Sequence, residues 1–60
     1  MPAEELLTET ETAALLHVSV RTLRRWRQQG SGPPAHKAGR RVLYARGEVL
    51  AWLRAERRSP

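Results

Sequence analysis

The sequence predicts a mainly α-helical domain with one small β-hairpin. Three features carry this prediction: an amphipathic stretch over residues 19–30, a cluster of chain breakers over residues 30–34, and a second apolar stripe at helical spacing after residue 46. With 60 residues the chain has the length of one domain. We expect that domain to span residues 1–60, with an ordered core over about residues 6–56.

A first helix is expected from Glu9 to Leu16. Thr8 followed three residues later by Glu11 fits a capping box, in which each side chain satisfies a backbone donor of the other residue. Residues 6–7 before it fit a short extended segment packed on the core, and residues 1–5 a frayed terminus.

The central helix is expected between Ser19, a good N-cap residue, and Gly30, which can end a helix in the left-handed conformation. Val20, Leu23 and Trp26 recur every three residues and therefore share an apolar face. The residues predicted to flank this face or lie opposite it are Arg21, Thr22, Arg24, Arg25 and Gln28.

The connection between these helices is the three residues His17, Val18 and Ser19. A turn this short, with an apolar residue in it and a capping serine at its end, is typical of a helix-turn-helix arrangement. We expect Val18 to point inward and His17 to adopt the left-handed conformation, a position more often filled by glycine.

After the breakers, residues 35–44 predict a hairpin with its tip at Ala38 and Gly39. Val42 and Tyr44 alternate and are expected to face the core. The tip region carries three cations, Lys37, Arg40 and Arg41.

A third helix is expected from near Gly47 to about Arg57. Val49, Trp52 and Leu53 stand at i, i+3 and i+4, which is the stripe that a surface helix turns toward a core. Residues 57–60 fit a basic, disordered tail.

Charge is segregated along the chain. The net charge is +5, yet residues 1–18 contain four glutamates and no Lys or Arg, whereas residues 19–46 contain eight Lys or Arg and no acid. The central helix thus has no acid of its own to neutralise its arginines. A solvated face usually mixes signs, so this block favours a polyanionic partner, above all double-stranded DNA. An anionic membrane is the rival, but the apolar stripe is needed for the core.

Nothing in the sequence indicates catalysis, and we expect a protein that is not an enzyme and has no cofactor. The chain has no cysteine and two histidines, His17 and His36, which are too few for a zinc site. Neither histidine has an evident serine and acid partner, and Glu48 fits a helix-dipole role. Trp26 and Trp52 sit at helical spacing with aliphatic residues, which favours packing over base stacking.

The chain also has no apolar run of the roughly 20 residues that span a bilayer. Its N-terminus carries acids where a signal peptide has basic residues, so we expect a cytoplasmic protein.

Four motifs follow one another along the chain. They are Leu-Leu-Thr-x-x-Glu-x-Ala from Leu6 to Ala13, Val18-Ser19-x-x-Thr22-Leu23-x-x-Trp26, Gly39-Arg40-Arg41 followed by Tyr44, and Val49-x-x-Trp52-Leu53. In this order they resemble the motifs of small excisionases and MerR-like winged helix-turn-helix domains. The resemblance implies a second helix in the major groove and a hairpin, or wing, on the backbone or minor groove. By position, Ser19, Arg21, Thr22, Arg24 and Arg25 are the expected helix contacts and Arg40 and Arg41 the expected wing contacts. Gln28 and Lys37 join them on the predicted basic surfaces.

The sequence departs from the family pattern at two positions, and it lacks one region that full MerR regulators have. His17 stands where glycine is usual, and Gly47 replaces a polar cap before the third helix. The long dimerisation helix and effector domain of full MerR regulators are not present in these residues, so ligand sensing is not expected. The resemblance leaves two functions open. One is an excisionase that bends attachment-site DNA, associates head to tail on it and partners an integrase. The other is a small transcriptional regulator.

Overall fold

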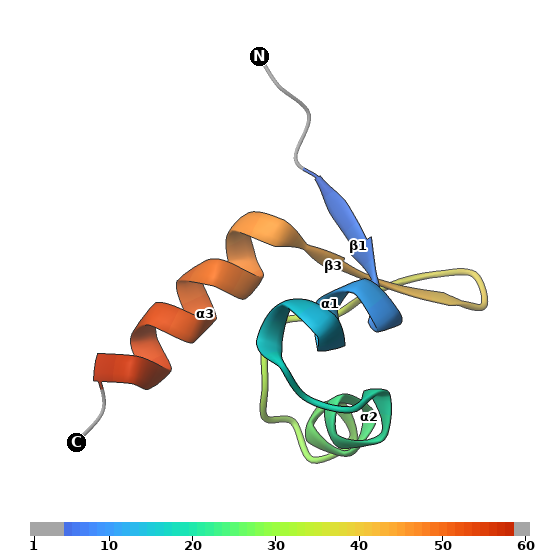
Figure 1. Ribbon diagram of the computed structural model, residues 1–60. Helices are drawn as coiled ribbons and strands as arrows, with labels where there is room; N and C mark the ends of the chain where they lie inside the picture. The colour runs from blue at the N-terminus through green and yellow to red at the C-terminus, as the bar shows by residue number, and fades with distance from the viewer. Residues whose placement is uncertain (1–4, 59–60) are drawn as a thin grey trace.

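The computed structural model describes residues 5–58, which fold into three helices and a small antiparallel sheet (Figure 1). The elements in order are β1 (Leu6–Thr8), α1 (Glu9–Leu16), α2 (Val20–Gln28), β2 (His36–Ala38), β3 (Arg41–Ala45) and α3 (Arg46–Arg58). In Figure 1, α1 lies between the sheet and α2, and α3 leads away from the end of β3. The predicted class is confirmed: the arrangement is a winged helix-turn-helix.

The sheet has the strand order β1-β3-β2, so β3 is the central strand. Leu7 pairs with Tyr44 on one side of β3, and His36 pairs with Leu43 on the other. The expected hairpin is therefore present, but the segment before α1 is a third strand, which the sequence analysis missed. Three residues carry too little alternation for a strand to be distinguished from other extended chain.

The hairpin turn lies one residue later than predicted. Ala38 pairs with Arg41, which leaves Gly39 and Arg40 as the two turn residues. Gly39 has a φ of 64°, and Arg40 has no positive φ, which is the pattern of a type II′ turn. Arg40 is thus at the tip of the wing.

Helix α1 begins and ends as its sequence predicts. The Thr8 hydroxyl accepts a hydrogen bond from the Glu11 N–H at 3.1 Å, and the Glu11 carboxylate accepts one from the Thr8 N–H at 2.8 Å. His17 adopts the left-handed conformation with a φ of 59°. The His17 and Val18 N–H groups donate to the Ala14 and Ala13 carbonyls, which closes the helix in a Schellman arrangement.

Helix α2 also has both predicted caps. The Ser19 hydroxyl accepts from the Thr22 N–H at 3.0 Å. Beyond the helix, the Gly30 and Ser31 N–H groups donate to the Arg27 and Trp26 carbonyls, and Gly30 has a φ of 76°. These caps fix where the basic helix starts and stops.

Helix α3 follows β3 without a loop, which differs from the prediction. Because it starts at Arg46, Gly47 lies inside the first turn and does not occupy the cap position. The Arg46 N–H donates to the Glu5 carbonyl at 2.9 Å, so Glu5 is held by the fold and is not frayed. The helix includes residues 57–58, which were expected in the tail. The rest of the predicted frayed terminus and tail, residues 1–4 and 59–60, lies outside the described residues.

The core is assembled from one side chain of each main element. Leu23 of α2, Tyr44 of β3 and Val49 of α3 are at most 1% exposed, and Ala13 of α1 is 2% exposed. Trp26 and Trp52 form a half-buried pair beside this cluster, with ring centroids 5.6 Å apart. The expectation that the tryptophans pack is confirmed, but the most buried positions belong to smaller side chains and to Tyr44.

A pair of Leu→Ala substitutions tests this core. Leu23→Ala should lower the free energy of unfolding by about 2–5 kcal/mol, because it leaves a cavity among buried side chains. The matched control is Leu6→Ala, the same chemical change at a side chain that is 55% exposed, which should cost under about 0.5 kcal/mol. Urea unfolding followed by tryptophan fluorescence measures both, and equal losses would contradict the assignment.

Candidate nucleic-acid interface

The outward face of α2 carries the residues that the sequence predicted there. Ser19, Arg21, Arg24, Arg25 and Gln28 are exposed, and Thr22 is half-buried. The four residues Arg21, Arg24, Arg25 and Gln28, together with Val20, line one shallow hollow on this face. Val20 was predicted on the apolar face, and it does pack partly against the core. It therefore sits at the border between the two faces.

Ser19 and Thr22 are joined at the N-terminus of α2. Besides accepting from the Thr22 N–H, the Ser19 hydroxyl donates to the Thr22 hydroxyl at 3.0 Å. The first turn of α2 contains no acid. The positive end of the helix dipole is therefore not offset by a carboxylate of its own helix, which favours an anion nearby.

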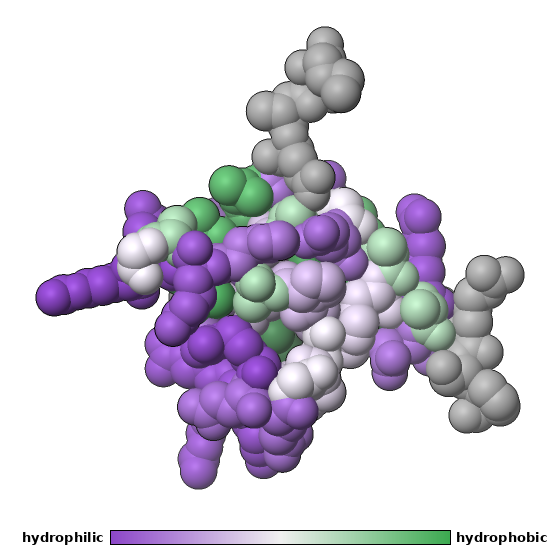
Figure 2. Space-filling model, turned by 180° about the vertical axis from the view of Figure 1, so that it is seen from behind, coloured by the Kyte–Doolittle hydropathy of each residue, from purple (hydrophilic) through white to green (hydrophobic). Residues whose placement is uncertain are grey.

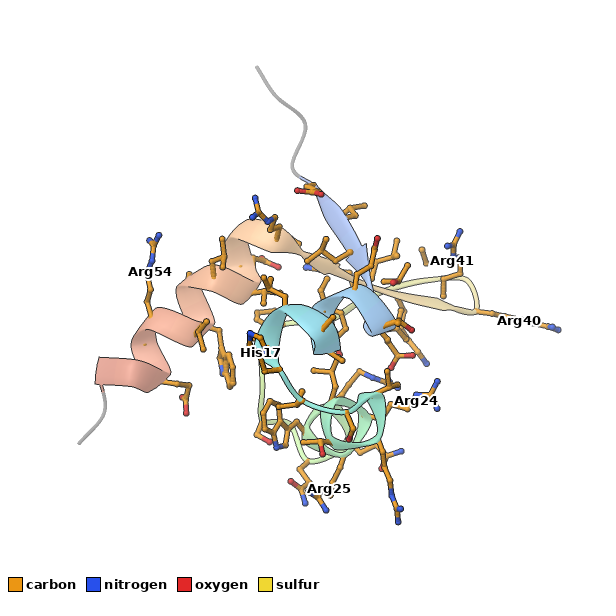
Figure 3. The ribbon with its side chains drawn as sticks, viewed as in Figure 1. His17, Arg24, Arg25, Arg40, Arg41 and Arg54 are labelled. Atoms are coloured by element: carbon orange, nitrogen blue, oxygen red, sulfur yellow. The ribbon has the colours of Figure 1, made fainter. Side chains whose placement is uncertain are left out.

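The hairpin presents the second group of cations. All of β2 is exposed, and so are Arg40 and Arg41. In Figure 3, Arg40 and Arg41 extend from the hairpin, and Arg24 lies between α2 and the hairpin in this view. Figure 2 shows hydrophilic side chains gathered over α2 and extending toward the hairpin tip.

An acidic residue that the sequence analysis did not connect to α2 reaches this face. The Glu9 carboxylate lies 3.4 Å from Arg24 Nε and 3.6 Å from an Arg27 terminal nitrogen. The central helix has no acid of its own, as predicted, but Glu9 of α1 partly neutralises these two arginines. These ion pairs join Glu9 of α1 to two arginines of α2, so they could not be predicted from the spacing of residues within one helix.

A polar junction surrounds this carboxylate. The Tyr44 hydroxyl, Arg27 Nε and one Glu9 oxygen are all buried and have no hydrogen-bond partner. Burial raises the pKa of Tyr44; the Arg27 guanidinium nearby opposes that rise, and the Glu9 charge adds to it. The Arg27 guanidinium is therefore close both to the Glu9 carboxylate and to the buried Tyr44 phenol.

The Lys and Arg side chains fall into two groups, those with an ion pair and those without one. In the part of the chain whose side chains are described, residues 5–56, Arg46 pairs with Glu5 at 3.7 Å, and Arg24 and Arg27 pair with Glu9. The Lys and Arg side chains there without an ion pair are Arg21, Arg25, Lys37, Arg40, Arg41 and Arg54. Five of these six are predicted interface residues, and Arg54 lies on α3 (Figure 3).

His36 is the exposed strand residue that was predicted, and it has an acidic partner that the prediction did not include. His36 Nε2 lies 2.7 Å from a Glu48 oxygen, which ties β2 to the first turn of α3. Both side chains are largely exposed, at 55% and 42%, so this contact adds little stability. The contact was not predictable from local spacing, because the partners are twelve positions apart in the chain.

Within the described residues, no group of three or more His, Cys, Asp or Glu could hold a metal ion. Among the described helices, none has the length and apolar character needed to cross a membrane.

The fold and its exposed cations define a class of protein, a DNA-binding helix-turn-helix domain. Residues 6–57 match the helix-turn-helix domain family, which covers most of the chain, and the protein belongs to that family. Members of this class bind double-stranded DNA and are typically not enzymes. No curated protein matches the chain significantly.

The raised pKa of Tyr44 predicts a stability loss in alkali. Since the folded state holds the phenol proton more tightly than the unfolded state, the stabilisation is present below about pH 10 and is lost as the pH rises through the folded-state pKa. We expect the free energy of unfolding to fall more steeply from about pH 9 to 11 in the wild type than in Tyr44→Phe.

Tyr44→Phe keeps the buried ring and removes only the unpartnered hydroxyl, so it should be nearly neutral at pH 7. Parallel urea curves across the pH series measure the difference, and identical pH dependence would refute the prediction.

Proposed function

We propose that α2 enters the major groove of DNA and that the β2–β3 hairpin is a wing on the neighbouring backbone or minor groove. The observation that carries this proposal is the set of unpaired, exposed cations on these two elements of a helix-turn-helix family member. The proposed contact residues are Ser19, Arg21, Thr22, Arg24, Arg25, Gln28, Lys37, Arg40 and Arg41.

The proposed contacts divide by chemistry. Arg21 and Arg25 are exposed and unpaired, and arginine reads guanine through two hydrogen bonds in the major groove. Ser19 and Thr22 stand at a helix N-terminus, where phosphate is favoured. The wing cations suit the backbone, whose contacts supply affinity and register but little sequence information.

We further propose that several copies bind side by side and bend the DNA between them. One recognition helix and one wing bury about 600–1,000 Å² on DNA, which corresponds to a short site and weak binding. Among the described residues, Leu6 is the only large hydrophobic side chain that is exposed. That surface offers little for a stable dimer in free solution, so a monomer that loads cooperatively on adjacent direct repeats fits it better.

We propose that the protein is an excisionase of a phage or prophage. Such a protein bends attachment-site DNA and directs an integrase toward excision. The resemblance of four ordered motifs to small excisionases supports this assignment. A small MerR-like transcriptional regulator shares the same motifs and is the alternative.

Two arginine variants separate base reading from backbone contact. Arg25→Ala should weaken binding to the cognate site by about 1–3 kcal/mol and relax specificity. Arg41→Ala should weaken cognate and random DNA alike and make the salt slope shallower by about 0.9. Arg54→Ala, which removes an equal charge from α3, is the control. It should change neither the specificity of binding nor the salt slope. Fluorescence anisotropy titrations on both DNAs measure these effects, and relaxed specificity in Arg41→Ala would reverse the two roles.

The biological assignment is tested on DNA carrying one or several copies of the selected site. We expect a monomer by analytical ultracentrifugation, cooperative loading on direct repeats and a bend detected by circular permutation gels. In a recombination assay with an integrase that acts on the same attachment sites, added protein should promote excision and suppress integration. A dimer on an inverted repeat with no effect on recombination would favour the regulator.

A further inference from the structure

Arg24 differs from the other proposed contacts on α2 because it already holds an anion. Its Nε lies 3.4 Å from Glu9 Oε1, and its side chain is 59% exposed. A guanidinium has five N–H donors, so one edge can face Glu9 while the others face solvent. In the free protein this arginine is thus shared between an internal carboxylate and the surface proposed to meet DNA.

Glu9 is held more firmly than its partner. Its side chain is only 18% exposed, and it also lies 3.6 Å from Arg27, which is 29% exposed. Glu9 starts α1, while Arg27 is near the end of α2, so the carboxylate is fixed by the packing of the two helices. Arg24 is therefore the member of the pair that is more accessible to solvent and to DNA.

We propose that Glu9 is a specificity-determining residue: it withholds Arg24 from DNA phosphates in non-specific complexes and yields it only in the cognate complex. This inference rests on the proposed placement of α2 in the groove. On random DNA the carboxylate at 3.4 Å competes with a phosphate for the guanidinium. In the cognate complex the base contacts of neighbouring arginines hold α2 close to the backbone, and a phosphate takes over.

The salt dependence of binding follows from this exchange. Each phosphate neutralised by a cation contributes a slope of about 0.9 in a plot of log K against log salt. Glu9→Gln, which keeps the shape of the side chain, should therefore steepen the slope on random DNA by about 0.9 and leave the slope on the cognate site unchanged. Between about 50 and 200 mM salt, that adds about 3.5-fold to the loss of affinity for random DNA.

Two controls isolate the effect. Glu56→Gln makes the same change in net charge at an exposed residue of α3, and it should leave both slopes unchanged. Glu9→Gln combined with Arg24→Gln should have the same slopes as Arg24→Gln alone, since the effect passes through Arg24. Thermal melts of each variant check that it is folded. If Glu9→Gln is unfolded, Arg24→Gln tests the inference: it should make the slope on the cognate site shallower by about 0.9 and leave the slope on random DNA unchanged, and an equal change on both DNAs would overturn the inference.

The outcomes are distinct. An unchanged slope on random DNA in folded Glu9→Gln overturns the inference, and so does an equal change in Glu56→Gln or in the double variant. Absence of DNA binding by the wild type would instead overturn the proposed function. A steeper slope on random DNA alone, lost without Arg24, supports the inference.

Discussion

The structure depends on the joint burial of Leu23, Tyr44 and Val49, which come from α2, β3 and α3 and are each at most 1% exposed. A chain of 60 residues buries only about 60% of its unfolded surface. It has no cysteine, so no disulfide supplements this core. Because Leu23 must face inward, the residues on the opposite side of α2 must face solvent. The same contact that stabilises the domain therefore orients the basic helix.

The turn between α1 and α2 makes that orientation specific. His17 takes a left-handed conformation that costs a non-glycine residue some strain, and the hydrogen bonds of His17 and Val18 to α1 offset it. Ser19 then starts α2 at once. With so few residues in the connection, α2 has little freedom to shift against α1. A basic face at a defined angle is what recognition of a groove requires.

The segregated charge of the sequence becomes partly mixed in space. Glutamates from the acidic N-terminal segment return to the basic segment, with Glu5 at Arg46 and Glu9 at Arg24 and Arg27. In residues 5–56, the cations without an ion pair lie mostly on the outward face of α2 and on the wing. The five unpaired cations of the proposed interface carry a charge of +5, which equals the net charge of the whole chain, so the excess positive charge of the protein is concentrated there.

The sequence by itself determined the features that depend on neighbours within a few residues. The capping box at Thr8, the caps of α2, the left-handed His17 and the sides of α2 were all predictable, because each follows from local hydrogen bonding or helical periodicity. The tertiary structure alone decided that residues 6–8 join the sheet, that His36 meets Glu48 and that Glu9 reaches Arg24. These contacts join positions a dozen or more residues apart. Their existence depends on how whole elements pack, which no local spacing encodes.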